Sequence, residues 1–378
     1  MLHKVAVATA SLLAGAGLLT APAAAHVLAQ GGTVAPPSPV VSSPRCGSEP
    51  TTGAGWERLF DGLRGGWSGG DGAASVRLPD GRLLWLFGDT FTGSVRADGR
   101  RSTDTTIVRN SMVVTDRACA TVVAPGREAL ANGADGSWLW PTAGAVTAGG
   151  EPSEQAVVTV FAQRLVRDSH DAFGFRRSGT AVVTVTVPWR GLPVVGVPVD
   201  LPTSDVLWGA ALVREGATTW VYGTRPVGEA LVFGRDLLLA RSPTTSLQDP
   251  ATWTYRTADG WSARRTDAAV VRSGRQGVST VPSAAVVSGA YVVVTKAQEF
   301  LDPTVLELRA PHPWGPWTET PLLTAATSTS VLRYSPAVVA GATRAHAIVV
   351  VSRTSLSLDA LMSDAEVARP TFHDVRLG

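Results

Sequence analysis

Two aspartates lie at equal distances from a turn near the start of the chain. Pro79-Asp80-Gly81 is typical of a tight turn, because proline fixes φ and glycine tolerates a positive φ. A β-hairpin centred on Asp80 would place Asp71 opposite Asp89, with their Cα atoms about 5 Å apart. The sequence therefore predicts that the two carboxylates share one site.

A pair of carboxylates at this distance is suited to acid–base chemistry. Two like charges so close cannot both ionise freely, so the pKa of one rises while the pKa of the other stays low. A protonated acid beside a carboxylate is the arrangement that glycoside hydrolysis requires, so Asp71 and Asp89 are the predicted catalytic residues. Two other interpretations stay open: the carboxylates would fix the turn by binding backbone amides, or they would help to hold a structural calcium ion.

The elements that must position this pair are β-strands. Short alternating runs rich in Val, Thr and Trp are separated by Gly, Pro, Asp and Ser, and helical periodicity is scarce. A strand–turn–strand pattern recurs five times at spacings of about 55 to 75 residues, which leaves room for four strands each time. We therefore expect an all-β, five-bladed β-propeller in which each blade is a four-stranded antiparallel sheet; a many-stranded β-sandwich is the alternative. The second strand of each unit is expected at residues 85–89, 159–163, 220–225, 292–296 and 349–353.

In a propeller, the first strand of each blade lines the central channel, so the starts of the first strands and the ends of the second strands meet at one face. Aromatic rings at that face would stack on sugar rings, and arginine donors would bind hydroxyl or carboxylate groups. For each tryptophan, packing between blades is the alternative role. The predicted substrate-binding residues are Trp140, Gln163, Trp208, Arg225, Lys296, Tyr334 and Arg353.

The start of the chain reads as an export signal. A short basic start, an apolar run from Val5 to Leu19 and the small residues Ala23-Ala24-Ala25 predict a signal peptide over residues 1–25. Residues 26–45 are rich in Pro, Ser and Gly and are expected to form a flexible linker, so the propeller would span 46–378. Cys46 and Cys119 are the only cysteines, and in an exported protein we expect them to form a disulfide, with two unpaired thiols as the alternative.

Charge and composition exclude several classes of partner. The net charge is +2 and no basic cluster occurs, which disfavours binding to nucleic acid or to an anionic membrane. After the signal peptide, no apolar run approaches the 18 or so residues that a membrane-spanning helix needs. We expect a secreted, soluble monomer. The few histidines lack metal-ligand spacing and no phosphate-binding glycine loop is present, so apart from the calcium alternative we expect no metal or cofactor.

Several segments of the first unit resemble a known group of proteins. They are Asp71-Gly72-Ala73, Leu78-Pro79-Asp80-Gly81-Arg82, Trp85-Leu86-Phe87-Gly88-Asp89-Thr90-Phe91 and Arg109-Asn110-Ser111. They resemble secreted actinobacterial five-bladed propellers of unknown function, akin to the glycoside hydrolase family 43 type. Some relatives with a similar Gly-Asp-Thr-Phe signature are endo-D-arabinanases. The resemblance, which spans about residues 56–377, implies a glycosidase that acts on arabinan or a related glycan, with Asp71 and Asp89 as its acidic residues.

The resemblance is incomplete at two positions. Family 43 enzymes use three acids from the starts of the first three blades, whereas this chain has Trp140-Pro141 and Trp208-Gly209 at the second and third places. Two functional hypotheses follow. The first is an extracellular glycoside hydrolase that acts on a polysaccharide or oligosaccharide through its two aspartates. The alternative is a non-catalytic carbohydrate-binding propeller, which is favoured by the absence of the glutamate that family 43 enzymes use as general acid in the third blade.

Overall fold

A computed structural model describes residues 41–42, 47–63, 66–149, 151, 154–171, 173–229 and 231–378. The expected signal peptide, residues 1–25, lies outside the described residues. Of the expected linker, residues 26–45, only Val41–Ser42 is described. These two residues form strand β1, which pairs with residues 120–121 of β8. The signal peptide and the linker therefore stay predictions.

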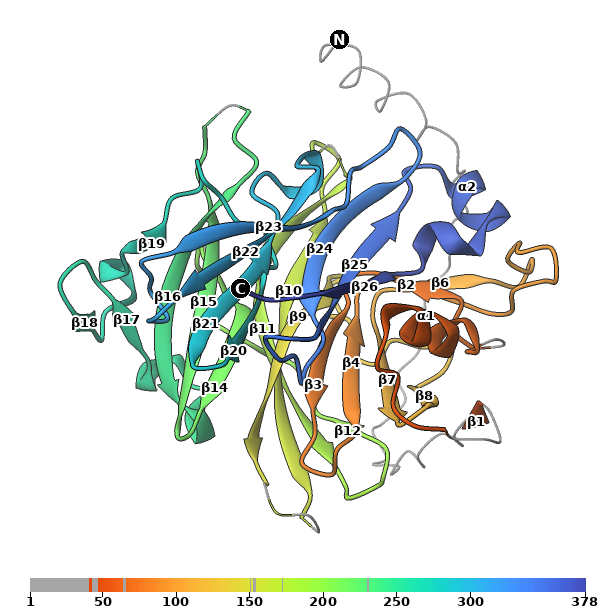
Figure 1. Ribbon diagram of the computed structural model, residues 1–378, viewed down its shortest axis with the longest axis horizontal. Coiled ribbons are helices and arrows are strands. Elements are labelled where there is room, and N and C mark those ends of the chain that lie inside the picture. The colour runs from red at the N-terminus through yellow and green to blue at the C-terminus, as the bar shows by residue number, and fades with distance from the viewer. Residues whose placement is uncertain are drawn as a thin grey trace, which may run out of the picture.

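The described chain folds mainly into five large antiparallel sheets that follow one another along the sequence (Figure 1). Sheet 1 contains β1, β3 (Ala74–Arg77), β4 (Leu83–Phe87), β7 (Ser111–Asp116) and β8 (Cys119–Val123). Sheet 2 contains β9 (Trp138–Ala148), β10 (Ala156–Arg167), β11 (Phe175–Val187), β12 (Val194–Val195) and β13 (Val199–Asp200). Sheet 3 contains β14 (Leu207–Glu215), β15 (Thr218–Pro226), β16 (Arg235–Pro243), β17 (Thr254–Arg256), β18 (Trp261–Ser262) and β19 (Val270–Arg272). Sheet 4 contains β20 (Ser283–Val287), β21 (Ala290–Thr295), β22 (Thr304–Ala310) and β23 (Thr318–Thr324), and sheet 5 contains β24 (Leu332–Val338), β25 (Ala347–Thr354) and β26 (Thr371–Val375).

The strand counts differ from the four per sheet that the repeat spacing predicted. Within the described residues the five sheets have five, five, six, four and three strands. The cause is local: β1 adds an edge strand to sheet 1, and the long segment after β16 adds β17, β18 and β19 to sheet 3. A further small sheet, formed by β2 (Gly69–Gly70), β5 (Thr90–Thr92) and β6 (Thr106–Val108), extends the first unit beyond β3 and β4.

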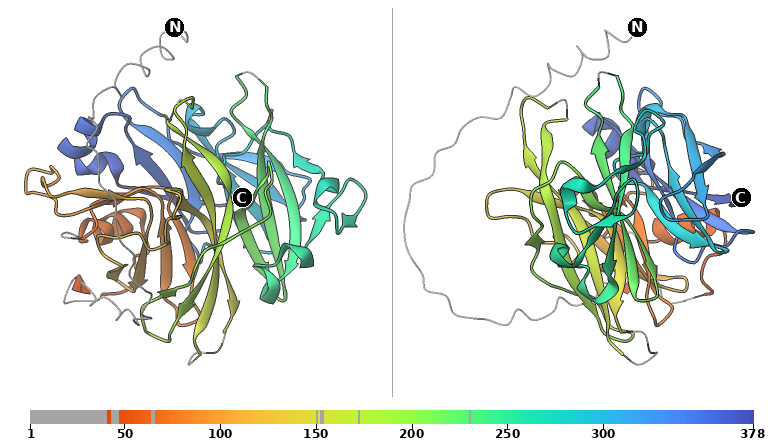
Figure 2. Two further views of the ribbon diagram at one scale, coloured as in Figure 1. Left: turned by 180° about the vertical axis from the view of Figure 1, so that it is seen from behind. Right: turned by 90° about the vertical axis from the view of Figure 1, so that its left-hand side faces the viewer.

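The first strands of the five sheets surround a central cavity. Each of β3, β9, β14, β20 and β24 packs against the next, and β24 returns to pack against β3. A hydrogen bond of 2.9 Å from the Ala340 amide to the Ser75 hydroxyl joins sheet 5 to sheet 1. The cavity has a volume of about 720 Å³ and is lined by residues of these five strands and their flanks. Sheets arranged around a shared channel in chain order are the arrangement of a propeller, and Figure 2 shows their splay from two further sides.

Close approach of the inner strands depends on one glycine in particular. A Cβ atom at Gly144 of β9 would lie 2.9 Å from the Val76 side chain of β3, so only glycine lets the two strands come this near.

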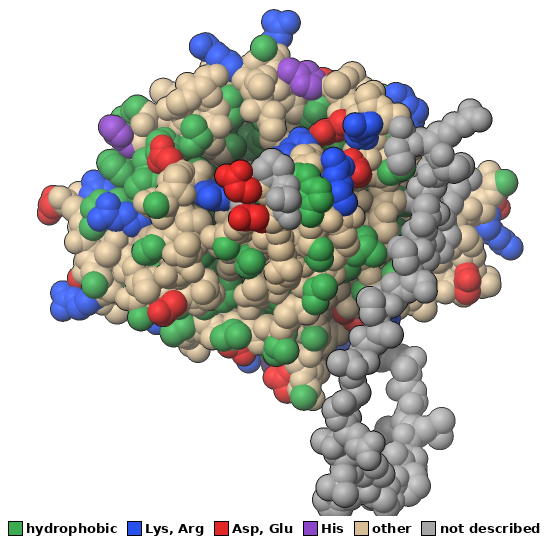
Figure 3. All heavy atoms as spheres, turned by 90° about the horizontal axis from the view of Figure 1, so that it is seen from below, with side chains coloured by type: hydrophobic (Ala, Val, Ile, Leu, Met, Phe, Trp, Pro, Cys, Tyr) green, Lys and Arg blue, Asp and Glu red, His purple; other side chains and the backbone are tan. Residues whose placement is uncertain are grey.

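At the end of the molecule seen from below in Figure 3, positive and negative side chains are interspersed. No single-sign patch is visible on that face.

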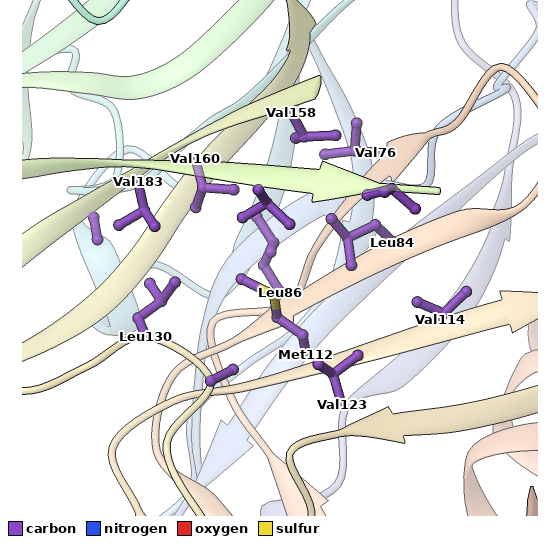
Figure 4. Close-up of a cluster of buried hydrophobic side chains, with 14 of the residues drawn as sticks. Val76, Leu84, Leu86, Met112, Val114, Val123, Leu130, Val158, Val160 and Val183 are labelled. Atoms are coloured by element: carbon purple, nitrogen blue, oxygen red, sulfur yellow. The ribbon is translucent and has the colours of Figure 1, made fainter. Parts of the chain in front are cut away.

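The core lies between neighbouring sheets rather than in one central mass. In Figure 4, Leu84 and Leu86 of sheet 1 face Val158 and Val160 of sheet 2, with Met112 beside them, and all five side chains are fully buried. The Val-rich strands are buried in this way because each sheet covers one face of the next. Similar clusters lie at the other contacts between sheets.

Helix α1 (Gly53–Asp61), which the strand pattern did not predict, covers the junction between sheets 1 and 5. It begins after Thr52, whose hydroxyl accepts a hydrogen bond of 3.2 Å from the Gly55 amide. The Phe60 ring lies 5.2 Å from Trp85 of sheet 1 and 5.5 Å from Phe372 of sheet 5, between ring centroids. The helix therefore fastens the first sheet to the last.

The remaining helical elements are short. They are α2 (Leu358–Ser363) and the 3-10 turns η2 (Thr244–Ser246), η3 (Pro250–Thr252), η4 (Arg265–Asp267), η5 (Glu299–Leu301) and η6 (Ala365–Ala368). In the described part of the chain, no helix has the length and apolar character needed to cross a membrane.

The expected disulfide stays a prediction, because Cys46 lies outside the described residues. Cys119 is the first residue of β8. The residues next to the two cysteines do lie together: the Ala118 amide donates a hydrogen bond of 3.4 Å to the Gly47 carbonyl.

Candidate active site

The first hairpin has the register that its turn predicted. Ala74 pairs with Leu86 and Arg77 with Leu83, so the hairpin is centred on Asp80. The Leu78 amide donates to the Arg82 carbonyl at 2.8 Å, and Gly81 has a φ of 86°, which its lack of a Cβ permits.

The same register continues past the ends of β3 and β4 to the two aspartates. The Asp71 amide donates to the Asp89 carbonyl at 3.2 Å, and the Gly88 amide donates to the Asp71 carbonyl at 2.7 Å. Asp71 and Asp89 are therefore direct cross-strand neighbours, as the sequence predicted.

This pair lies beside residues that line one end of the central cavity. Gly72, Thr142 and Ser335 line the cavity, and the site residues Asp71, Trp140 and Tyr334 are one or two positions away from them in three different sheet units. In Figure 1 this is the end of β3 that faces β2 and β6, opposite the Asp80 turn.

The Asp71 carboxyl group is enclosed by a tyrosine and a glycine. The Tyr334 hydroxyl donates a hydrogen bond of 2.5 Å to Asp71 Oδ2. On the other side, a Cβ atom at Gly88 would lie 2.6 Å from Asp71 Oδ1, so a larger residue there would displace the carboxyl group. Burial, with the nearby Asp89 charge as a second cause, raises the pKa of Asp71 to about 7, against the opposing effect of the Tyr334 hydrogen bond.

The Asp89 carboxylate has stronger partners than Asp71. Arg109 Nη1 lies 3.3 Å from both of its oxygens, and the Trp140 indole N–H donates to Oδ1 at 2.9 Å. Burial raises the pKa of Asp89, whereas the Arg109 charge and the two donors favour its ionised form. The pKa values of both aspartates are raised by burial, but only Asp89 is paired with a positive charge, so Asp71 is the group of the pair that is better suited to keep its proton.

Arg109 is a site residue for which the sequence analysis proposed no role. Thr90 pairs with Val108 across β5 and β6, so the next pair in that register is Asp89 with Arg109. The guanidinium group also lies over the Trp138 ring, 4.7 Å from its centroid. The Asp98-Gly99 turn could not have identified this residue by the same counting, because the hairpin at its tip is centred on Asp98, with Val95 opposite Arg101, whereas the pairing of Thr90 with Val108 is offset from that centre.

Of the residues predicted to bind substrate, four lie at or near this end of the molecule. Trp140 and Tyr334 contact the two aspartates directly, as donors to the carboxylates. Gln163 is half-buried opposite Trp140 in the β9–β10 register. Arg225, at the end of β15, is 33% exposed and pairs with Asp236 at 3.1 Å.

Three others are committed to the fold. Trp208 is 3% exposed and packs 5.2 Å from the Tyr255 ring, so its prediction as a sugar contact is wrong and it belongs to the core of sheet 3. Lys296 is fully buried, and its ammonium group donates to the Ala325 and Arg333 carbonyls at 2.8 Å each, so it holds two loops instead of substrate. Burial lowers the pKa of Lys296 to about 8.

Arg353 is likewise bound within its own sheet unit. Its Nε donates to the Arg369 carbonyl at 2.7 Å, and its Nη2 lies 3.5 Å from Glu366. With 16% of the side chain exposed, it supports the segment before β26.

The described residues contain no cluster of three or more His, Cys, Asp or Glu side chains that could hold a metal ion.

A family model described as "Domain of unknown function (DUF5005)" matches residues 55–376. Comparison with curated protein sequences gives no match. Among solved structures, the chain is similar to a candidate hydrolase from Bacteroides ovatus, with a TM-score of 0.67, 18% identity, and coverage of 89% of this chain and 93% of that one. This similarity shows a shared fold.

Two further solved structures are similar at lower scores. An exo-β-1,3-galactanase from Phanerochaete chrysosporium, solved with galactose, has a TM-score of 0.47 and 12% identity, over 90% of this chain and 67% of that one. A GH43_1 enzyme from Xanthomonas citri, complexed with xylotriose, has a TM-score of 0.45 and 10% identity, over 85% of this chain and 92% of that one.

Proposed function

The chain belongs to the DUF5005 family, and we propose that it is a glycoside hydrolase in which Asp71 is the general acid and Asp89 is the second carboxylate. One observation carries this proposal. Two cross-strand aspartates beside one end of a cavity have different partners: Asp71 is bound by a tyrosine hydroxyl and its pKa is raised to about 7, whereas Asp89 is bound by the Arg109 guanidinium and the Trp140 indole, which favour its ionised form. Paired carboxyl groups whose surroundings separate their pKa values are typical of glycosidases.

Each residue of the site then has a defined task. Asp71 gives its proton to the glycosidic oxygen as the bond from the anomeric carbon to that oxygen breaks. Asp89 faces the positive charge that develops on the sugar ring and either attacks the anomeric carbon or takes a proton from the water that does so. Arg109 and Trp140 fix the orientation of the Asp89 carboxylate, and Tyr334 fixes that of Asp71.

The substrate is proposed to be arabinan or a related polysaccharide outside the cell. Support for this finer statement comes from the resemblance at Gly88-Asp89-Thr90-Phe91 and from the signal peptide that the sequence predicts at residues 1–25. The proposal includes a secreted monomer with a Cys46–Cys119 disulfide and a five-bladed propeller whose innermost strands are β3, β9, β14, β20 and β24.

The test compares hydrolysis by three variants. Asp71→Asn and Asp89→Asn should each lower the release of reducing sugar from soluble arabinan, galactan or xylan by about 100-fold to 10,000-fold. Asp104→Asn, at an exposed aspartate between β5 and β6, is the matched control and should keep full activity. If Asp71→Asn hydrolyses the active polymer at the parent rate, the assignment is wrong.

A non-catalytic carbohydrate-binding protein is the second candidate. The observation that favours it is the start of β14, where Trp208 and Gly209 stand in place of a third acid and Trp208 is buried. Binding of a polymer by the unmodified protein, with no reducing sugar released over long incubation, would select this candidate.

A further inference from the structure

An aromatic row leads away from the Asp89 carboxylate. Trp140, which donates to Asp89, lies 4.8 Å from the Phe175 ring at an interplanar angle of 81°. Phe175 lies 6.2 Å from Phe173, and Phe173 lies 6.2 Å from Phe300, between ring centroids. We call these four rings the aromatic row. Its length exceeds that of a single sugar ring.

The row is built by a hairpin that projects beyond the rest of sheet 2. Strands β10 and β11 remain paired up to Arg167 and Phe175, whereas β9 begins opposite residue 165. The hairpin leans over sheet 3, where Arg177 Nη2 donates to the Asp205 carbonyl at 2.6 Å. Its tip reaches η5 of sheet 4 through the contact of Phe173 with Phe300. The hairpin thus extends from sheet 2 past sheet 3 to sheet 4 at the upper end of the molecule in Figure 1, and we call this edge the rim.

Apolar side chains from three separate loops remain exposed along this rim. Phe173 is 49% exposed, Phe233 is 43% exposed and Leu301 is 51% exposed. The Phe233 and Gly234 amides both donate to Gln298 Oε1 at 3.0 Å, which ties the β15–β16 loop to the segment that carries η5. Aromatic side chains that folding leaves half in water, next to a candidate active site, indicate a binding surface.

A sugar chain fits this surface better than a protein partner does. Ring faces stack on the apolar faces of sugars, and the row is continuous with the aspartate pair through Trp140, so an occupant of the site has neighbouring units beside Phe175 and Phe173. We infer that the aromatic row binds the successive sugar residues of a glycan chain beyond the bond at Asp71 and Asp89. This inference rests on the proposed function and adds to it where the polysaccharide lies and which side chains hold the sugar residues that are not cleaved.

The experiment separates binding from hydrolysis. Migration in native gels containing arabinan, galactan or xylan is measured for Asp71→Asn, which retains bound polymer, and for the same protein carrying Phe173→Ala. Loss of one stacked ring should raise the apparent Kd for the retarding polymer by about 5-fold to 10-fold, since aromatic contacts of this kind are worth about 1 kcal/mol. Val197→Ala, at an 83% exposed residue between β12 and β13, should leave migration unchanged.

A second measurement tests whether the Phe173→Ala variant keeps the folded structure of the site. The pKa of Asp71, followed by carboxyl NMR on proteins that keep the aspartate, should be the same with Phe173 and with Ala at that position, because Phe173 does not contact either carboxylate. An unchanged Kd in Phe173→Ala, or the absence of retardation by all three polymers, overturns the inference. If the polymer is bound through Phe173 but Asp71→Asn costs no hydrolysis, the aromatic row stands as a glycan site and the proposed catalytic role falls instead.

Discussion

Replacing Asp71 with asparagine should stabilise the protein at alkaline pH. The pKa of Asp71 rises from 3.8 to about 7 on folding, chiefly because the carboxyl group is buried. Below pH 3.8 the group is protonated in both the folded and the unfolded chain. As the pH rises towards 7, the unfolded chain releases this proton while the folded protein keeps it, so the free energy of unfolding falls.

The magnitude follows from the pKa difference. Each pH unit is worth about 1.4 kcal/mol, so above pH 7 the ionised Asp71 costs the folded state at most about 4 kcal/mol. Asparagine has the shape of the protonated acid and still accepts the Tyr334 hydrogen bond, but it cannot ionise. We therefore expect Asp71→Asn to unfold with a free energy about 2 to 4 kcal/mol higher than the parent at pH 8, and within about 1 kcal/mol of it at pH 4.

The assay is urea denaturation at pH 4, 6 and 8, followed by tryptophan fluorescence, because the twelve tryptophans of the chain report on packing. Asp104→Asn is the control, since it removes an exposed charge and should show no difference that grows with pH. If Asp71→Asn is no more stable than the parent at pH 8, Asp71 is not a desolvated acid and the reasoning behind its role as proton donor is refuted.

Three other predictions concern the residues around this pair. Tyr334→Phe removes a donor that favours the ionised form of Asp71, so the pKa of Asp71, followed by carboxyl NMR, should rise above 7 by about one to two pH units. Arg109→Met removes the charge that favours ionised Asp89, so the acidic limb of the pH–rate profile should move to higher pH; an unmoved limb would argue that Asp89 does not need to be ionised. Trp208→Ala should lower the free energy of unfolding by about 3 to 5 kcal/mol, because the ring fills the core. It should leave the Kd for glycan unchanged under native conditions, and a selective loss of affinity would restore Trp208 as a sugar contact.

The sequence alone determined the local β structure and the pairing of the two aspartates. Each of the five segments expected to hold a second strand does so, in β4, β10, β15, β21 and β25. The register of the first hairpin could be predicted from the sequence because side chains alternate with a period of two along each strand. In addition, the Pro79-Asp80-Gly81 turn fixes which residues of the two strands pair. Asp71 and Asp89 follow from the centre of that turn by counting, whereas Arg109 does not follow from the Asp98-Gly99 turn, because the register shifts between that turn and the pairing of β5 with β6.

Only the tertiary structure decided which groups surround those carboxylates. Tyr334 is 263 residues from Asp71 and Trp140 is 51 residues from Asp89, so their hydrogen bonds exist only once sheets 1, 2 and 5 have packed together. The burial of Trp208 and Lys296 could not be predicted from the sequence for the same reason. Strand periodicity shows which side chains point to the same face of a sheet, but the neighbouring sheet decides which of those faces is shielded from water. The chemical difference between the two aspartates is thus a property of the packed sheets and not of the first hairpin alone.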